Sequence, residues 1–307
     1  MNTYIAYFDR LRNNPRLLLS GFLVVLGSLF LGSYPASLFR NFYVQNKGID
    51  KSAFEEALMQ NPQLANLNLI FNLMPYLVAA FALWFVYKFY LHGSLIESIR
   101  PGKKWNIAKL LIPGLIWFLF SLGSDVYFIW KNPDNYVFAF EWQSFAVLLG
   151  VGLVLLPVQT GFEEFFFRGY IMNSLNILSR RLWVGLIGSS VLFALMHGMN
   201  PEIGQYGFWN MMPIYFYFGF VLALLTVWDQ SLEIAWSLHF FNNLYSLLIV
   251  SSQGSALKVR PLFMQQEVAI QSVQWYFILS LTLVSILILF LFKLKWPIQM
   301  NWKNEQL

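Results

Sequence analysis

The chain has 307 residues, of which 58% are hydrophobic and only 11% are charged. Its mean hydropathy of +0.55 is far from the balance of a soluble domain and indicates an integral membrane protein. Cysteine is absent, which excludes disulfides, thiol nucleophiles and thiolate metal sites. The net charge of +5 comes from basic residues between apolar runs rather than on one stripe, so nucleic acid is not an expected partner.

Eight apolar runs are long enough to cross a bilayer, since a transmembrane helix needs about 20 apolar residues. Their length and lack of alternation exclude a transmembrane barrel. The sequence therefore predicts an all-α, polytopic membrane protein with about eight transmembrane helices. In chain order, the predicted spans are 17–39, 67–87, 110–130, 143–176, 182–200, 207–228, 232–251 and 272–292.

These spans divide the chain into three regions. Residues 1–142 hold helices 1–3 and a polar loop at 40–66, residues 143–251 hold helices 4–7, and residues 252–307 hold a loop, the last helix and a basic tail. The first apolar run is too long for a signal peptide, and we expect it to be retained as a span.

The distribution of basic residues predicts how the chain is oriented. If the N-terminus is inside, 14 Lys and Arg residues fall on the inner side and 6 on the outer side. This bias places both termini in the cytoplasm, in the cell membrane if the source is prokaryotic. We expect one inner loop to face anionic lipid through Arg100, Lys103, Lys104 and Lys109.

The stretch TGFEEFFFRGY, residues 160–170, puts three charged residues inside the fourth span. Ionisable groups at membrane depth are expensive and usually pair with one another. Glu164 and Arg168 are four residues apart and share one helix face, so they can form an ion pair. Glu163 lies about 100° round the helix from Glu164 and needs a partner from another helix.

A second pair of adjacent glutamates, Glu55 and Glu56, provides a comparison. It lies in KSAFEEALMQ, where Ser52 and Glu55 have the spacing of a capping box at the start of a short amphipathic helix. Polar residues surround this pair, so we interpret it as a solvated helix face. Two adjacent glutamates therefore indicate a functional site only where apolar residues surround them.

Two of the three histidines also lie within predicted spans. If spans four and five form a hairpin that turns near Arg180, then Glu163 and His197 are each 17 residues from the turn and can meet at one depth. His239 lies in the seventh span, with Asn243 one helical turn later on the same face. These side chains are therefore expected to converge below the membrane surface.

The chemistry of this set fits peptide hydrolysis without a metal. A buried glutamate beside a histidine can accept a proton from a water molecule and make it a nucleophile. His239 and Asn243 are donor types suited to the oxyanion of a tetrahedral intermediate.

Three motifs in order, EEFFFR (EExxxR), FALMH (FxxxH, residues 193–197) and HFFNN (HxxxN, residues 239–243), resemble those of the CAAX protease and bacteriocin-processing family of intramembrane glutamic endopeptidases. The chain is similar over about 143–250 to type II CAAX prenyl endopeptidases such as the Ras-converting enzyme. This resemblance implies that residues 143–251, with helices 4–7, are the catalytic core. The resemblance implies a peptide or membrane-associated protein substrate and no cofactor. It also implies site roles: Glu163 and His197 activate water, His239 and Asn243 form the oxyanion hole, and Glu164 and Arg168 support the site.

Three other hypotheses remain at this point. A metalloprotease is one, although no HExxH motif is present. A proton-coupled transporter is another, although the chain shows no inverted repeat. A catalytically idle scaffold or immunity protein is the third. The substrate also stays open among a prenylated C-terminal motif, a bacteriocin leader, a peptide pheromone and a membrane-protein segment.

Overall fold

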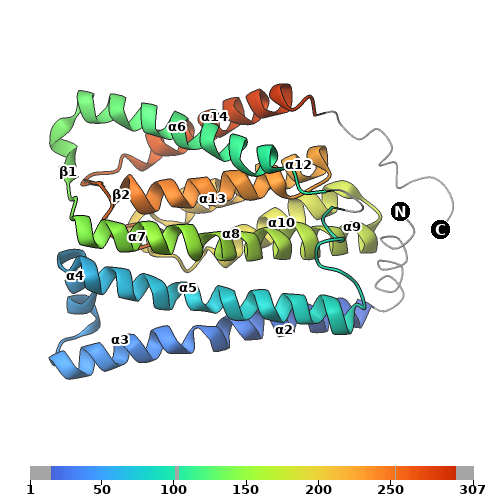
Figure 1. Ribbon diagram of the computed structural model, residues 1–307, viewed down its shortest axis with the longest axis horizontal. Helices are drawn as coiled ribbons and strands as arrows, with labels where there is room; N and C mark the ends of the chain where they lie inside the picture. Colours follow the sequence, from blue (N-terminus) through green and yellow to red (C-terminus); the bar gives the residue numbers. More distant parts are fainter. Residues whose placement is uncertain (1–14, 101–103, 253, 295–307) are drawn as a thin grey trace.

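The computed structural model describes residues 15–100, 104–252 and 254–294, which form one elongated helical bundle (Figure 1). The chain runs back and forth along this bundle, and the beginning of its first described helix and the end of its last lie at the same end. The helices are α2 (Pro15–Gly32), α3 (Tyr34–Lys47), α4 (Lys51–Gln60), α5 (Pro62–Phe85), the π-helix η1 (Val86–Tyr90), α6 (Ile107–Lys131), α7 (Trp142–Val154), α8 (Leu156–Glu164), the π-helix η3 (Phe165–Met172), α9 (Asn173–Ser179), α10 (Leu182–Met196), α11 (Pro201–Tyr206), α12 (Phe208–Asp229), α13 (Glu233–Leu248) and α14 (Ile270–Leu291).

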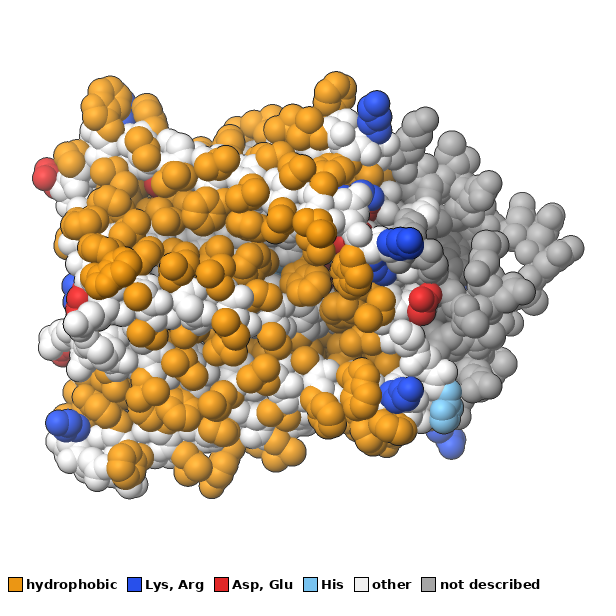
Figure 2. Space-filling model, in the orientation of Figure 1, with side chains coloured by type: hydrophobic (Ala, Val, Ile, Leu, Met, Phe, Trp, Pro, Cys, Tyr) orange, Lys and Arg blue, Asp and Glu red, His pale blue; other side chains and the backbone are white. Residues whose placement is uncertain are grey.

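Each of the eight predicted spans coincides with a helix or a series of helices. Six helical segments of the described chain are long and apolar enough to cross a membrane, whereas α10 and α13 are shorter, with 15 and 16 residues. Figure 2 shows hydrophobic side chains along the middle of the visible face, with charged side chains near its two ends. The protein is an all-α, polytopic, multi-pass membrane protein, as predicted.

A small sheet closes one end of the bundle, beside α4 (Figure 1). Its first strand follows a short 3₁₀ turn, η2 (Pro133–Asn135). Its strands are β1 (Tyr136–Phe138), β2 (Val250–Ser252) and β3 (Phe263–Gln265), in the order β1-β3-β2, with β1 antiparallel and β2 parallel to β3. We call this end of the bundle the sheet end, and the other, which carries the turn between α9 and α10, the opposite end.

The region predicted as a polar loop at 40–66 is mostly helical, because it contains the end of α3, all of α4 and the start of α5. The predicted capping box is wrong. Helix α4 begins at Lys51, and Asp50 is its N-cap, whose Oδ1 accepts a hydrogen bond from Ala53 N at 2.8 Å. The Ser52 hydroxyl donates to Asp50 instead of capping the helix itself.

The prediction that Arg100 faces lipid is also wrong. Its side chain is 2% exposed and lies 3.1 Å from Glu233 Oε1, with the guanidinium over the Trp105 ring. Lys109 pairs with Asp229 at the same end, Lys104 is exposed, and Lys103 lies outside the described residues. These ion pairs join the segment before α6 to the start of α13, and the first turn of α6 to the end of α12.

Helix α13 lies among α6, α7, α8 and α12, and glycines let its neighbours approach closely (Figure 1). A Cβ at Gly114 of α6 would lie 2.6 Å from the Ser237 carbonyl oxygen, and one at Gly161 of α8 would lie 2.8 Å from the Trp236 ring. Small residues at such contacts are how membrane helices gain packing energy in a solvent as apolar as their side chains. This close packing sets α13 directly against α8, which carries the two glutamates.

Candidate active site

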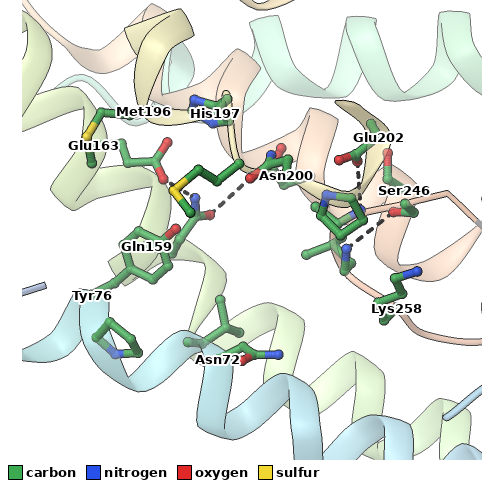
Figure 3. Close-up of a pocket in the computed structure, with 18 of the residues that line it drawn as sticks. Asn72, Tyr76, Gln159, Glu163, Met196, His197, Asn200, Glu202, Ser246 and Lys258 are labelled. Carbon is green, nitrogen blue, oxygen red and sulfur yellow. Dashed lines mark hydrogen bonds between the residues drawn. The ribbon is translucent and has the colours of Figure 1, made fainter. Parts of the chain in front are cut away.

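The structure brings four of the six predicted site residues to one cavity of about 720 Å³. Glu163 comes from the end of α8, His197 directly follows α10, and His239 and Asn243 come from α13. Glu163 and His197 both line this cavity (Figure 3). The predicted hairpin exists, since α9 and α10 are joined at Arg180, which has a left-handed backbone with φ of 55°.

Glu164 and Arg168 form the predicted ion pair, with Arg168 Nη1 3.0 Å from Glu164 Oε1. Both side chains are fully buried, and Arg168 Nη2 also donates to the Gly219 carbonyl at 2.9 Å. The guanidinium lies over the Phe193 ring at 4.7 Å. Arg168 is on η3, and short π-helical segments of this kind are frequent at functional sites.

His239 connects the two glutamates. Its Nδ1 lies 2.7 Å from Glu164 Oε1, and its Nε2 lies 3.6 Å from Glu163 Oε2. Because a carboxylate paired with arginine only accepts hydrogen bonds, Nδ1 carries the proton that it donates to Glu164. His239 is 2% exposed, so the ring is held at the inner wall of the cavity with Nε2 toward Glu163.

Glu163 has a local partner that the sequence analysis missed. Gln159, one turn earlier on α8, donates from Nε2 to Glu163 Oε1 at 2.6 Å. Asn243 in turn donates from Nδ2 to Gln159 Oε1 at 3.1 Å. The other carboxylate oxygen of Glu163, Oε2, is buried and makes no hydrogen bond within the described chain. The spacing of four between Gln159 and Glu163 is the one signal in the sequence that pointed to this contact.

His197 is oriented by its own helix. Its Nδ1 donates to the Phe193 carbonyl at 2.8 Å, which leaves Nε2 of the neutral ring as a proton acceptor. The imidazole lies between the rings of Phe193 and Tyr215, with centroids 4.4 and 4.7 Å away. Phe193 is buried and supports His197 by packing.

The cavity extends from these buried groups toward the sheet end. Its lining there includes Arg40, Glu55, Glu202 and Lys258, and Lys258 Nζ lies 3.8 Å from Glu55 Oε2. Glu55 is half exposed, as expected for a solvated helix face, but it also contributes to the cavity rim, which the sequence did not indicate.

Other polar residues of the lining were not predicted. Tyr76 and Asn72 of α5 lie opposite Gln159 (Figure 3), and Asn200 binds the Tyr215 hydroxyl at 3.2 Å. No group of three or more metal-ligating side chains occurs in the described parts of the chain.

Comparison with known proteins identifies this region. A family model described as type II CAAX prenyl endopeptidase Rce1-like matches residues 142–245. Residues 142–245 form an Rce1-like domain. All six predicted site residues fall within it, and it runs from the start of α7 into α13.

The similarity extends beyond the Rce1-like domain in one curated relative. The uncharacterized protein YyaK of Bacillus subtilis (strain 168) is 29% identical over 239 residues, which cover 76% of this chain and 77% of YyaK. No solved structure is significantly similar to the chain. The Rce1-like domain thus indicates a CAAX-type membrane protease at the level of the family, while α2–α6 and α14 surround it.

Proposed function

We propose that this protein is an intramembrane endopeptidase of the glutamic type, in which Glu163 and His197 activate a water molecule. His239 and Asn243 stabilise the oxyanion that forms. The observation that carries the proposal is the buried connection of Glu163, His239 and Glu164 at the wall of a cavity that His197 and Asn243 also line.

Charge balance supports a proton-transfer role for Glu163. Glu164 and Arg168 neutralise each other as a buried pair. Glu163 and His239 then carry no net charge when they share one further proton, in addition to the proton on His239 Nδ1. Burial strongly favours such a neutral cluster over an isolated charge. A proton held by this pair is available for transfer to or from a reacting group.

The proposed reaction uses these groups in order. Glu163, assisted by Nε2 of His197, takes a proton from water, and the resulting hydroxide forms a bond to the carbonyl carbon of the peptide. The carbonyl oxygen becomes an oxyanion, which accepts hydrogen bonds from Nε2–H of protonated His239 and from the second N–H of the Asn243 amide. The C–N bond then breaks, and the leaving nitrogen takes the proton that Glu163 received.

We further propose that the substrate is a peptide, or a segment of a membrane-associated protein, that enters the cavity from the sheet end. The polar rim formed by Arg40, Glu55 and Lys258 supports this direction. Whether a lipid is attached to the substrate depends on the shape of the cavity and is decided by experiment.

The experiment compares membranes that contain the wild-type protein, Glu163→Gln or Glu56→Gln, and detects new peptide ends by mass spectrometry. Glu163→Gln keeps an acceptor for Gln159 but removes the base, so we expect cleavage to fall by about 100-fold or more. Glu56→Gln makes the same chemical change on an exposed face of α4 and is expected to cleave normally.

Equal cleavage by wild type and Glu163→Gln would show that the mechanism is wrong. Loss of cleavage on chelation would favour a metalloprotease, whereas no cleavage by any variant would favour a scaffold or a transporter.

A further inference from the structure

A second cavity of about 600 Å³ adjoins the catalytic one. It lies between α6, α12, α13 and α14, next to the sheet. The two cavities share six lining residues, which are Glu202, Tyr215, Phe218, Asn242, Ser246 and Ser255. The two cavities are therefore adjacent, and a side chain of a peptide bound beside Glu163 and His197 would have only a short distance to cover to the second cavity.

Asp125 is the unusual residue of this second cavity. It belongs to α6, which is otherwise an apolar span, and it lines the cavity wall. Its Oδ2 accepts a hydrogen bond from the Tyr245 hydroxyl at 2.5 Å, but it forms no ion pair within the described residues. Ionisable residues inside membrane spans commonly mark a binding site and have a specific partner. Within the described residues, no cationic side chain pairs with Asp125.

The other groups of the lining have the same character. Glu202 and Glu267 are also acidic, and the described residues that line this cavity include no Lys, Arg or His. The catalytic cavity differs, because Arg40, Lys258 and two histidines line it. Charge alone therefore distinguishes the two cavities.

Aromatic rings complete the wall. Trp117, Tyr245 and Tyr276 are among the aromatic side chains that α6, α13 and α14 contribute. The faces of such rings attract ammonium and guanidinium groups, most strongly where water is excluded. Burial, followed by the charge of Asp125, raises the pKa of the nearby Tyr136 to about 12.

The acidic lining begins at the junction of the two cavities. Glu202 Oε1 accepts a hydrogen bond from Ala256 N at 2.7 Å, while its Oε2 is buried and completes no hydrogen bond in the described structure. Glu202 lines both cavities, whereas Asp125 lines only the second one.

We propose that the second cavity is a specificity pocket that binds a Lys or Arg side chain of the peptide held in the catalytic cavity, with Asp125 as the counter-charge. This inference rests on the proposed function for the identity of the peptide. The binding of a cation to the pocket does not depend on catalysis and is tested separately.

The first test measures binding of acetyl-Phe-Arg-amide and acetyl-Phe-citrulline-amide to the purified protein by calorimetry. The two probes differ in charge but hardly in shape. We expect the arginine probe to bind at least about tenfold more tightly to the wild-type protein, as one ion pair with aromatic contacts provides. Asp125→Asn should abolish this preference, since asparagine still accepts the Tyr245 hydrogen bond but carries no charge.

Two variants make the result specific. Asp125→Glu retains the charge and should restore most of the preference for arginine. Asp134→Asn removes a carboxylate from the exposed turn before the sheet, outside the cavity lining, and should leave the preference unchanged. Equal binding of both probes to wild type, or an unchanged preference in Asp125→Asn, would overturn the proposal.

The second test reads cleavage sites by mass spectrometry in wild type and Asp125→Asn. Wild-type sites should carry Lys or Arg at a fixed distance from the cut bond, and Asp125→Asn should lose this enrichment. An arginine preference in binding without any cleavage would support the pocket and refute the peptidase. Cleavage by wild type with no preference for basic residues would refute the pocket and leave the peptidase standing.

Discussion

Gln159 shows how the site is held together at the scale of single residues. Its amide accepts from Asn243 and donates to Glu163, so it links the proposed oxyanion donor to the proposed base across two helices. A side chain with both a donor and an acceptor is required for this link. We therefore regard Gln159 as a positioning residue rather than a catalytic one.

Replacing Gln159 tests that role. Gln159→Met keeps the length of the side chain but removes both hydrogen bonds. We expect kcat to fall by about tenfold to a hundredfold, with KM and the melting temperature little changed, because the reacting groups are misplaced while the helices still pack. Gln63→Met, on an exposed face of α5, is the matched control. An equal loss of stability and activity in Gln159→Met would indicate a purely structural role.

The sequence was informative about some residues of the site and silent about others. The Glu164–Arg168 pair followed from spacing along one helix, and the structure confirms it. Gln159 and Tyr76 were not predicted, because an amide or a phenol in an apolar span is common and its partner depends on contacts between helices. Arg100 was misjudged for the same reason, since its partner Glu233 lies far along the chain.

Helix packing around α13 decides whether the site assembles. At Gly114 a new Cβ would lie 2.6 Å from the Ser237 carbonyl oxygen, whereas at Gly123, on the same helix, it would meet nothing within 4 Å. The two glycines of α6 therefore form a natural pair for a test of helix contact.

We expect Gly114→Ala to lower the melting temperature and the activity together, because α6 and α13 must move apart. Gly123→Ala should leave the protein as stable or slightly more stable, by roughly 0.5–1 kcal/mol, since alanine costs less entropy in a helix. Thermal unfolding in detergent measures both. A Gly114→Ala protein as stable as wild type would mean that α6 does not need this close contact.

At the scale of elements, hydropathy was sufficient to place the helices but not their ends. All eight runs are helical because the backbone in lipid has to satisfy its own hydrogen bonds. The start of α4 was misplaced because Asp50 and Ser52 are both good capping residues, and only the backbone shows that Asp50 is the cap. The π-helix η3 has no signal in the sequence that we recognise.

At the scale of the whole molecule, the distribution of charge predicts which side of the membrane the proposed substrate comes from. The catalytic cavity reaches the sheet end, while Arg180, Arg181 and Lys104 lie at the opposite end. The excess of basic residues at that opposite end predicts that it faces the cytoplasm. We therefore predict that the cavity opens away from the cytoplasm.

Cysteine labelling tests this orientation cleanly, because the chain has no cysteine of its own. We expect an impermeant maleimide to label Asp134→Cys at the sheet end of intact cells, and to label Arg181→Cys only after the membrane is broken. Both positions are exposed in the structure. The reverse pattern would place the cavity on the cytoplasmic side and leave the catalytic proposal untouched.

We propose that Glu163 takes a proton from the water molecule that attacks a peptide bond. The most direct measurement follows one identified cleavage by the purified protein in H₂¹⁸O, with wild type, Glu163→Gln and Glu56→Gln compared by mass spectrometry. We expect a new carboxyl end carrying ¹⁸O in wild type and Glu56→Gln, and none in Glu163→Gln. The same labelled end produced at the same rate by Glu163→Gln would contradict it.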